Sequence, residues 1–155
     1  MNRVVVSPQY LQSLAHRPAI LAIAQALIPE FEMWWNAGRQ HADFGRNVPY
    51  HRPQDARDSA IWHVHVVPLC PPAEIIELHN WRKARRRYYR TSDRHLIYAA
   101  SACGWAYLLA YEHRDAHEIA DDHAYIEALA AAAEAWYGES KRFPMAEAAF
   151  PDDND

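Results

Sequence analysis

Two apolar segments joined by a four-residue turn constrain the fold of this chain most. Residues 94–100 and 105–112 each read as a β-strand, and the turn at 101–104 is short enough only for an antiparallel pair. A further strand, with residues alternating between two faces, is expected at 61–67. That alternation places Ile61, His63, His65 and Val67 on one face and Trp62, Val64 and Val66 on the other. With residues 87–92 as a polar and aromatic strand, the sequence predicts an antiparallel meander.

Helical segments are expected before the meander. Residues 3–6 form a short β-branched strand, and a helix should follow over 9–16. Pro18 begins a second helix, which Pro29 should end because proline lacks the backbone donor that a helix interior needs. A third helix should stop near Gly38.

The rest of the chain is organised by turn residues and caps. The polar segment 39–59 is rich in turn formers and predicts a long loop. Residues 72–81 should form one or two helical turns. Asp115, followed three positions later by Glu118, begins a final helix that should stop at Gly138. The length fits a single domain over 1–150 with an acidic, disordered tail over 151–155.

A basic tract stands out from the rest of the composition. Residues 82–94 carry seven basic side chains against one acid, a net charge of +6 in a chain whose formal net charge is −4. The basic residues are Arg82, Lys83, Arg85, Arg86, Arg87, Arg90 and Arg94. Folding gains nothing from crowding like charges, whereas binding to a polyanion does. Arginine binds phosphates through charge-assisted hydrogen bonds, and Tyr88 and Tyr89 can stack on bases. The tract therefore predicts contact with nucleic acid rather than a merely solvated loop.

Other features bear on the compartment. The sequence has no run of 18 apolar residues that would span a membrane, and its first residues lack the apolar core of a signal peptide. Cys70 and Cys103 are too few for a disulfide framework or a zinc motif. We therefore expect a cytoplasmic protein.

Ten histidines offer two kinds of chemistry. His63 and His65 share a strand face, which suits either a metal ion or proton transfer. A third metal ligand would come from His113, His117, Asp121 or Asp122. Since no HExxH or CxxC pattern exists, we expect no metal and no cofactor, and keep a small metalloenzyme as an alternative.

The second kind of histidine chemistry is RNA cleavage without a metal ion. It needs a base for the 2′-hydroxyl, an acid for the leaving 5′-oxygen and positive charge near the phosphate. Arg90, Arg94 and His95 lie together at the end of the basic tract. The meander should bring Arg94 and His95 near the loop that leads to His117.

Four segments follow in an order that resembles the YafO family of bacterial toxins. They are DFGRNVPYHRP, WHVHV, YYRTSDRHLIYA and YLLAYEHRDAHEIADD. The resemblance covers roughly Ala26 to Tyr137, and this family belongs to the RelE-like ribosome-dependent mRNA endonucleases. It implies an α+β, RelE-like fold: a small twisted, mainly antiparallel sheet with N-terminal helices packed on one face and a C-terminal helix.

The resemblance also implies an activity and partners. It implies cleavage of mRNA on the ribosome with contacts to rRNA, no metal, and neutralisation by a cognate antitoxin protein. The positions that match the family pattern are Arg46, His63, His65, Arg90, Asp93, His95 and His117. The spacing after Asp93 is one residue shorter than the pattern, which leaves open whether Arg94 or His95 faces inward.

We therefore expect the toxin of a type II toxin–antitoxin system, an mRNA interferase in which His95 and His117 are the candidate base and acid. Expected catalytic residues are Arg90, Arg94, His95, His117 and His65. Expected RNA-binding residues are Arg46, Arg82, Lys83, Arg85, Arg86 and Arg87. The alternatives are a non-catalytic RNA- or ribosome-binding module and a small metalloenzyme that uses His63 and His65.

Overall fold

A five-stranded sheet forms the centre of the computed structural model, which describes residues 1–69 and 75–150. The strands are β1 (Val4–Val6), β2 (Phe44–Pro49), β3 (Ile61–Val66), β4 (His95–Ala100) and β5 (Ala106–Glu112), in the spatial order β1-β5-β4-β3-β2. Strand β1 pairs with β5 in parallel, and the other neighbouring strands are antiparallel. The expected antiparallel pairing of residues 94–100 with 105–112 is confirmed by β4 and β5, and β3 joins them as a third antiparallel strand.

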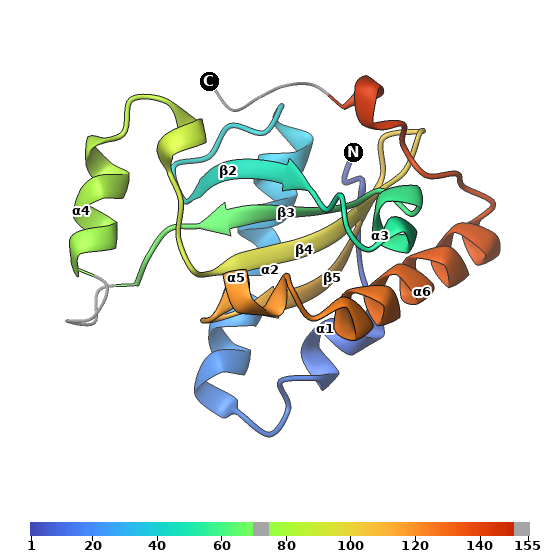
Figure 1. Ribbon diagram of the computed structural model, residues 1–155, viewed down its shortest axis with the longest axis horizontal. Helices are drawn as coiled ribbons and strands as arrows, with labels where there is room; N and C mark the ends of the chain where they lie inside the picture. The colour runs from blue at the N-terminus through green and yellow to red at the C-terminus, as the bar shows by residue number, and fades with distance from the viewer. Residues whose placement is uncertain (70–74, 151–155) are drawn as a thin grey trace.

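Helices cover both faces of the sheet (Figure 1). Helices α1 (Pro8–Gln12) and α2 (Pro18–Asn36) pack on one face, over a core that includes Trp62, Leu96 and Tyr98. Helices α3 (Gln54–Asp58) and α6 (His123–Ser140) pack on the other face, over Ile61 and Ile97. The expected α+β class is confirmed, and the C-terminal helix lies on the face opposite the N-terminal helices.

Four further elements complete the described part of the fold. They are α4 (Ile75–Lys83), η2 (Arg87–Tyr89), α5 (Ala116–Ile119) and η3 (Glu147–Ala149), and α4 lies beside the sheet (Figure 1). The helix expected within 72–81 is therefore present from Ile75. Residues 70–74 and the expected acidic tail at 151–155 lie outside the described part of the chain.

Pro29 does not end a helix, and that prediction was wrong. Helix α2 runs through Pro29 to Asn36, although proline inside a helix costs about 3 kcal/mol. The next two turns bury Phe31, Trp34 and Trp35 against the sheet, and the Phe31 ring lies 5.2 Å from the Tyr98 ring. Burying each large apolar side chain stabilises the fold by about 1.5–3 kcal/mol, which exceeds the cost of the proline.

The long loop expected over 39–59 is also wrong, since β2 and α3 occupy most of it. Gly45 concealed the strand, because glycine is typical of turns. Here it has a packing role: a Cβ at this position would overlap the Arg90 carbonyl oxygen and lie 2.6 Å from the Trp81 ring. The backbone of Arg46 then donates a hydrogen bond of 2.9 Å to that carbonyl.

Residues 87–92 do not form the expected strand. The segment contains the 3₁₀ turn η2, and none of the side chains of this turn is buried, so it has no apolar face that could pack as a strand does. Val67 also departs from its expected face and packs against the core beneath α2, since β3 has ended at Val66.

The helices at the two ends of the chain differ from expectation in their bounds. Helix α1 ends at Gln12 rather than near residue 16. The final helix is two helices, because Asp122 caps a new one by accepting a hydrogen bond from the Tyr125 backbone N–H. Helix α6 continues past Gly138 to Ser140.

Candidate functional site

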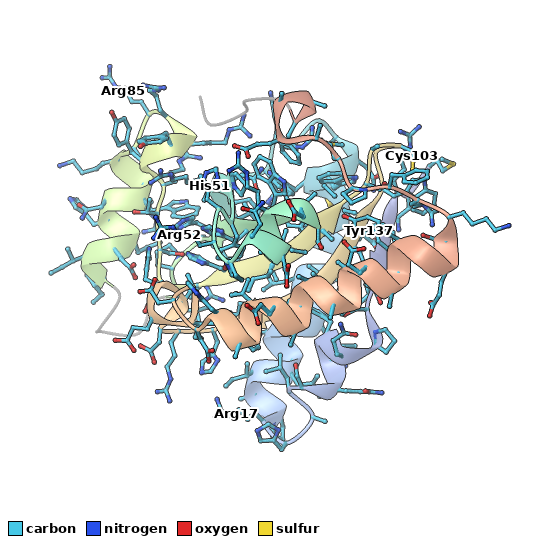
Figure 2. All side chains as sticks on the ribbon, turned by 45° about the vertical axis from the view of Figure 1, so that its right-hand side comes forward. Arg17, His51, Arg52, Arg85, Cys103 and Tyr137 are labelled. Carbon is cyan, nitrogen blue, oxygen red and sulfur yellow. The ribbon has the colours of Figure 1, made fainter. Side chains whose placement is uncertain are left out.

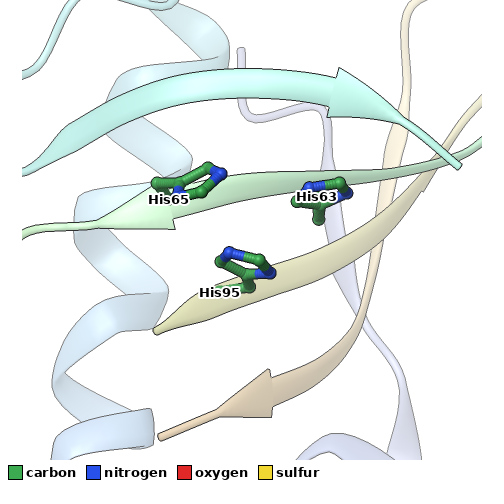
Figure 3. A group of neighbouring side chains, drawn as sticks. All are labelled: His63, His65 and His95. Carbon is green, nitrogen blue, oxygen red and sulfur yellow. The ribbon is translucent and has the colours of Figure 1, made fainter. Parts of the chain in front are cut away.

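Three histidines meet on the sheet face opposite α2. His63 and His65 project from β3, and His95 projects from β4 directly opposite His65. The His95 ring centroid lies 4.2 Å from that of His65 and 4.6 Å from that of His63. Figure 3 shows the three rings on the same side of the two strands. The expected shared face of His63 and His65 is confirmed, and the register adds His95.

Burial keeps these imidazoles neutral. His65 is 3 % exposed and His95 is 1 % exposed, whereas His63 is half-buried at the surface of the cluster. Burial, and to a lesser extent the nearby His117, lower the pKa of His95 to about 4 against smaller opposing effects of the Ser92 backbone and Asp93. Burial and the neighbouring rings also lower the pKa of His63 and His65. A neutral imidazole retains a lone pair for a proton or a metal ion.

The three rings differ in their hydrogen bonds. Nδ1 of His65 lies 2.9 Å from the Ser92 backbone nitrogen and 3.0 Å from the Ser92 carbonyl oxygen, so its role there depends on the tautomer. Within the described residues, neither ring nitrogen of His95 nor Nδ1 of His63 has a hydrogen-bond partner of normal geometry. Leaving a buried polar atom unpaired costs about 1–3 kcal/mol, so these nitrogens require an explanation.

An exposed histidine lies above the cluster and is held by a carboxylate. The His117 ring centroid is 5.2 Å from that of His95, and its Nδ1 lies 3.0 Å from an oxygen of Asp93. The same carboxylate accepts hydrogen bonds from the backbone N–H groups of Asp115 and His117. Although partial burial opposes them, these contacts together lower the pKa of Asp93, so it is ionised at neutral pH. Asp93 therefore orients the His117 ring through Nδ1, and this contact does not use Nε2.

The basic tract joins this group of histidines through two contacts. The Arg46 guanidinium lies over the Tyr88 ring, 4.2 Å from its centroid, and its charge contributes to lowering the pKa of His63 and His65. The Asp93 backbone N–H donates a hydrogen bond of 3.1 Å to Glu77 on α4, the helix that carries Arg82 and Lys83. Helix α4 and η2 thus border the site with positive charge.

A pocket of about 340 Å³ lies within the basic tract. It is lined by Gln40, His41, Ala42, Arg85, Arg87 and Arg90. Figure 2 shows Arg85 extending from the end of this region, far from Cys103 at the other end of the molecule. Of the expected RNA-binding side chains, Arg85 and Arg87 share this pocket, Arg82 and Lys83 belong to the last turn of α4, and Arg46 lies over Tyr88 of η2.

Arg94 lies apart from the other expected catalytic residues. Its Nε donates a hydrogen bond of 2.9 Å to the Tyr111 hydroxyl, and its guanidinium also donates to the Val67 carbonyl. Tyr111 belongs to the core beneath α2, and Arg94 is only 2 % exposed. His95 rather than Arg94 therefore faces the histidine cluster, which resolves the alternative left open by the spacing after Asp93.

The structure thus unites His63, His65, His95 and His117 and keeps Arg46 at their border. It places Arg90 in the pocket with Arg85 and Arg87 and separates Arg94. Sequence reasoning missed the pairing of Asp93 with His117. The two residues are far apart in sequence, and no local pattern marks them as partners.

The fold and the site define a small α+β protein with a histidine cluster beside an arginine-rich surface. The family model described as "Toxin YafO, type II toxin-antitoxin system" matches residues 32–138. The match covers more than half of the chain, and the protein therefore belongs to this family of type II toxin–antitoxin toxins. Such a toxin has an antitoxin as partner. No curated protein and no solved structure matches the chain.

In residues 1–69 and 75–150, none of the helices has both the length and the apolar character needed to cross a membrane.

Proposed function

We propose that this toxin is a cytoplasmic, ribosome-dependent mRNA endonuclease formed by a single domain over residues 1–150. The observation that carries the proposal is the Asp93–His117 pair, an exposed imidazole oriented by a carboxylate beside an arginine-rich surface. Cleavage at a ribose requires a proton to leave the 2′-hydroxyl and another to reach the 5′-oxygen. A histidine whose Nδ1 is held by a carboxylate presents Nε2, which can take the proton from the 2′-hydroxyl and then return it to the leaving 5′-oxygen.

The basic residues supply the electrostatic part of this reaction. Arg46 lies at the border of the histidines, and Arg90 lies in the pocket formed with Arg85 and Arg87. Fixed positive charge near the scissile phosphate stabilises the charge that develops in the transition state. The remaining arginines of the tract would hold mRNA and rRNA phosphates. Arg94, His65 and His95 are buried, so they make no contact with RNA in the proposed reaction.

The experiment compares the parent toxin with His117→Gln after induction without an antitoxin, and then in purified translating ribosomes. The parent should arrest growth, shorten mRNAs and cleave naked RNA poorly. His117→Gln should lower cleavage at least about 100-fold, because glutamine cannot exchange a proton, while ribosome binding survives. Asp93→Asn should lower cleavage less, since it leaves the imidazole present but less well oriented.

His16→Gln serves as the matched control, because His16 is exposed on the connection between α1 and α2. It should cleave like the parent. Growth arrest with intact transcripts would instead identify a non-catalytic ribosome-binding module. Rapid cleavage of naked RNA would contradict the dependence on ribosomes.

A further inference from the structure

The buried histidines beneath His117 have a geometry that proton transfer to RNA does not use. His63 and His65 occupy alternate positions of β3, and His95 faces them from β4. One ring nitrogen from each of the three lies within 4.8 Å of the corresponding nitrogen of the other two. A tetrahedral zinc ion bound at about 2.0–2.1 Å places its nitrogen ligands about 3.3 Å apart, so modest side-chain rotation would bring the three onto one ion.

We propose that His63, His65 and His95 form a binding site for a divalent transition-metal ion with the ligand preference of Zn²⁺. Imidazole nitrogen is a preferred ligand of zinc, and three protein ligands leave the fourth tetrahedral position for water. His117 lies outside this set, since its Nδ1 is engaged by Asp93.

Unpaired buried nitrogens are the first independent support. Among the described residues, both ring nitrogens of His95 and Nδ1 of His63 lack a hydrogen-bond partner of normal geometry. A core position of this kind is ordinarily filled by an apolar residue, since an unpaired buried nitrogen destabilises the fold. A bound cation supplies the partner that the protein does not.

The surroundings of His65 are the second support. Metal-bound histidines commonly donate their other ring N–H to a backbone carbonyl, which fixes the ring and its tautomer. Nδ1 of His65 lies 3.0 Å from the Ser92 carbonyl oxygen and 2.9 Å from the Ser92 backbone nitrogen. An ion bound at Nε2 would select the tautomer in which Nδ1 donates to that carbonyl. Ser92 is itself held by hydrogen bonds from its hydroxyl to the carbonyls of Val66 and Arg94.

The test uses the full, untagged chain, freed of metal by a chelator and titrated with Co²⁺, whose visible spectrum reports its ligands. The parent should bind one Co²⁺ per chain, and Zn²⁺ should displace it. His95→Leu and His63→Gln should each weaken binding at least about 100-fold, because each removes a ligand. His63 is half-buried, so its variant keeps the test valid if His95→Leu does not fold.

His117→Gln is the matched control and should bind Co²⁺ like the parent. Absence of stoichiometric binding to the parent would overturn the proposal. So would unchanged binding by both ligand variants, or a loss in His117→Gln equal to theirs. Because no RNA is present, this result is independent of the proposed endonuclease activity.

Discussion

At the scale of single residues, His95 at the start of β4 and Arg94 immediately before it have opposite roles. His95 joins the histidine cluster, whereas Arg94, one position earlier, extends toward the core beneath α2. A one-residue step along a strand reverses the face of a side chain, so both cannot serve the same site. The Arg94 guanidinium satisfies the Tyr111 hydroxyl and the Val67 carbonyl, which indicates a structural role.

Arg94→Met tests that role. The substitution removes the hydrogen bonds that Arg94 donates to the Tyr111 hydroxyl and the Val67 carbonyl, and should lower the free energy of unfolding by about 2 kcal/mol. Arg85→Met, at an exposed position, should change it by less than about 0.5 kcal/mol. Denaturant titration measures both values. An Arg94→Met variant that is as stable as the parent yet fails to cleave RNA would assign the arginine to catalysis instead.

Glu112 provides a prediction about pH. Burial raises the pKa of this half-buried carboxyl above its usual 4.5, although the Tyr125 hydroxyl donates a hydrogen bond to it. Its contribution to stability is therefore complete below about pH 4.5 and is lost as the pH rises through the folded-state pKa. Glu112→Gln keeps an acceptor for Tyr125 and removes the charge. Its Tm should exceed that of the parent at pH 7 and match it near pH 4; a constant difference across this range would contradict the assignment.

At the scale of elements, two glycines differ in their structural role. Gly45 in β2 lies against the backbone of Arg90 and the ring of Trp81, so it permits the basic tract to dock on the edge of the sheet. Gly138 lies inside α6, and a Cβ there would meet nothing within 4 Å. The sequence alone predicts a break at both, but α6 continues through Gly138, and β2 continues through Gly45 with a shift in its pairing register between Phe44 and Asn47.

The pair Gly45→Ala and Gly138→Ala separates these roles. Gly45→Ala should destabilise the fold by about 1–3 kcal/mol, because the added methyl group overlaps backbone that cannot move freely. Gly138→Ala should stabilise it by about 0.5–1 kcal/mol, because alanine loses less backbone entropy in a helix. Thermal denaturation of both variants provides the measurement. Equal changes in stability for the two variants would show that Arg90 does not pack closely against Gly45.

At the scale of the whole molecule, charge is segregated. The basic tract carries +6 at one side of a chain whose net charge is −4, and Arg85 projects from that side (Figure 2). Such an arrangement directs a polyanion to one side of the protein. The Asp93–His117 pair lies next to that surface through the contact of Asp93 with Glu77 on α4.

Replacing Arg85, Arg86 and Arg87 by alanine tests this surface. Each phosphate contact contributes about 0.7 to the slope of log affinity against log salt for single-stranded RNA, so the slope should flatten by up to about 2. Arg17→Ala with Lys141→Ala, two exposed positions away from the tract, is the control and should leave the slope unchanged. An unchanged slope in the triple variant would show that the tract is only solvated.

What the sequence by itself determined is the local structure: the three central strands, the shared face of His63 and His65, and the position of the basic tract. Each follows from the two-residue period of a strand or from composition, which neighbouring residues set. The predictions of a helix end at Pro29 and of a loop around Gly45 were wrong, because tertiary packing outweighed the local conformational preference of these residues. The meeting of His95 with His65, the pairing of Asp93 with His117, and the burial of Arg94 were decided only by the tertiary structure. These depend on strand register and on contacts between distant segments, which are selected by the packing of the whole core rather than by any local pattern.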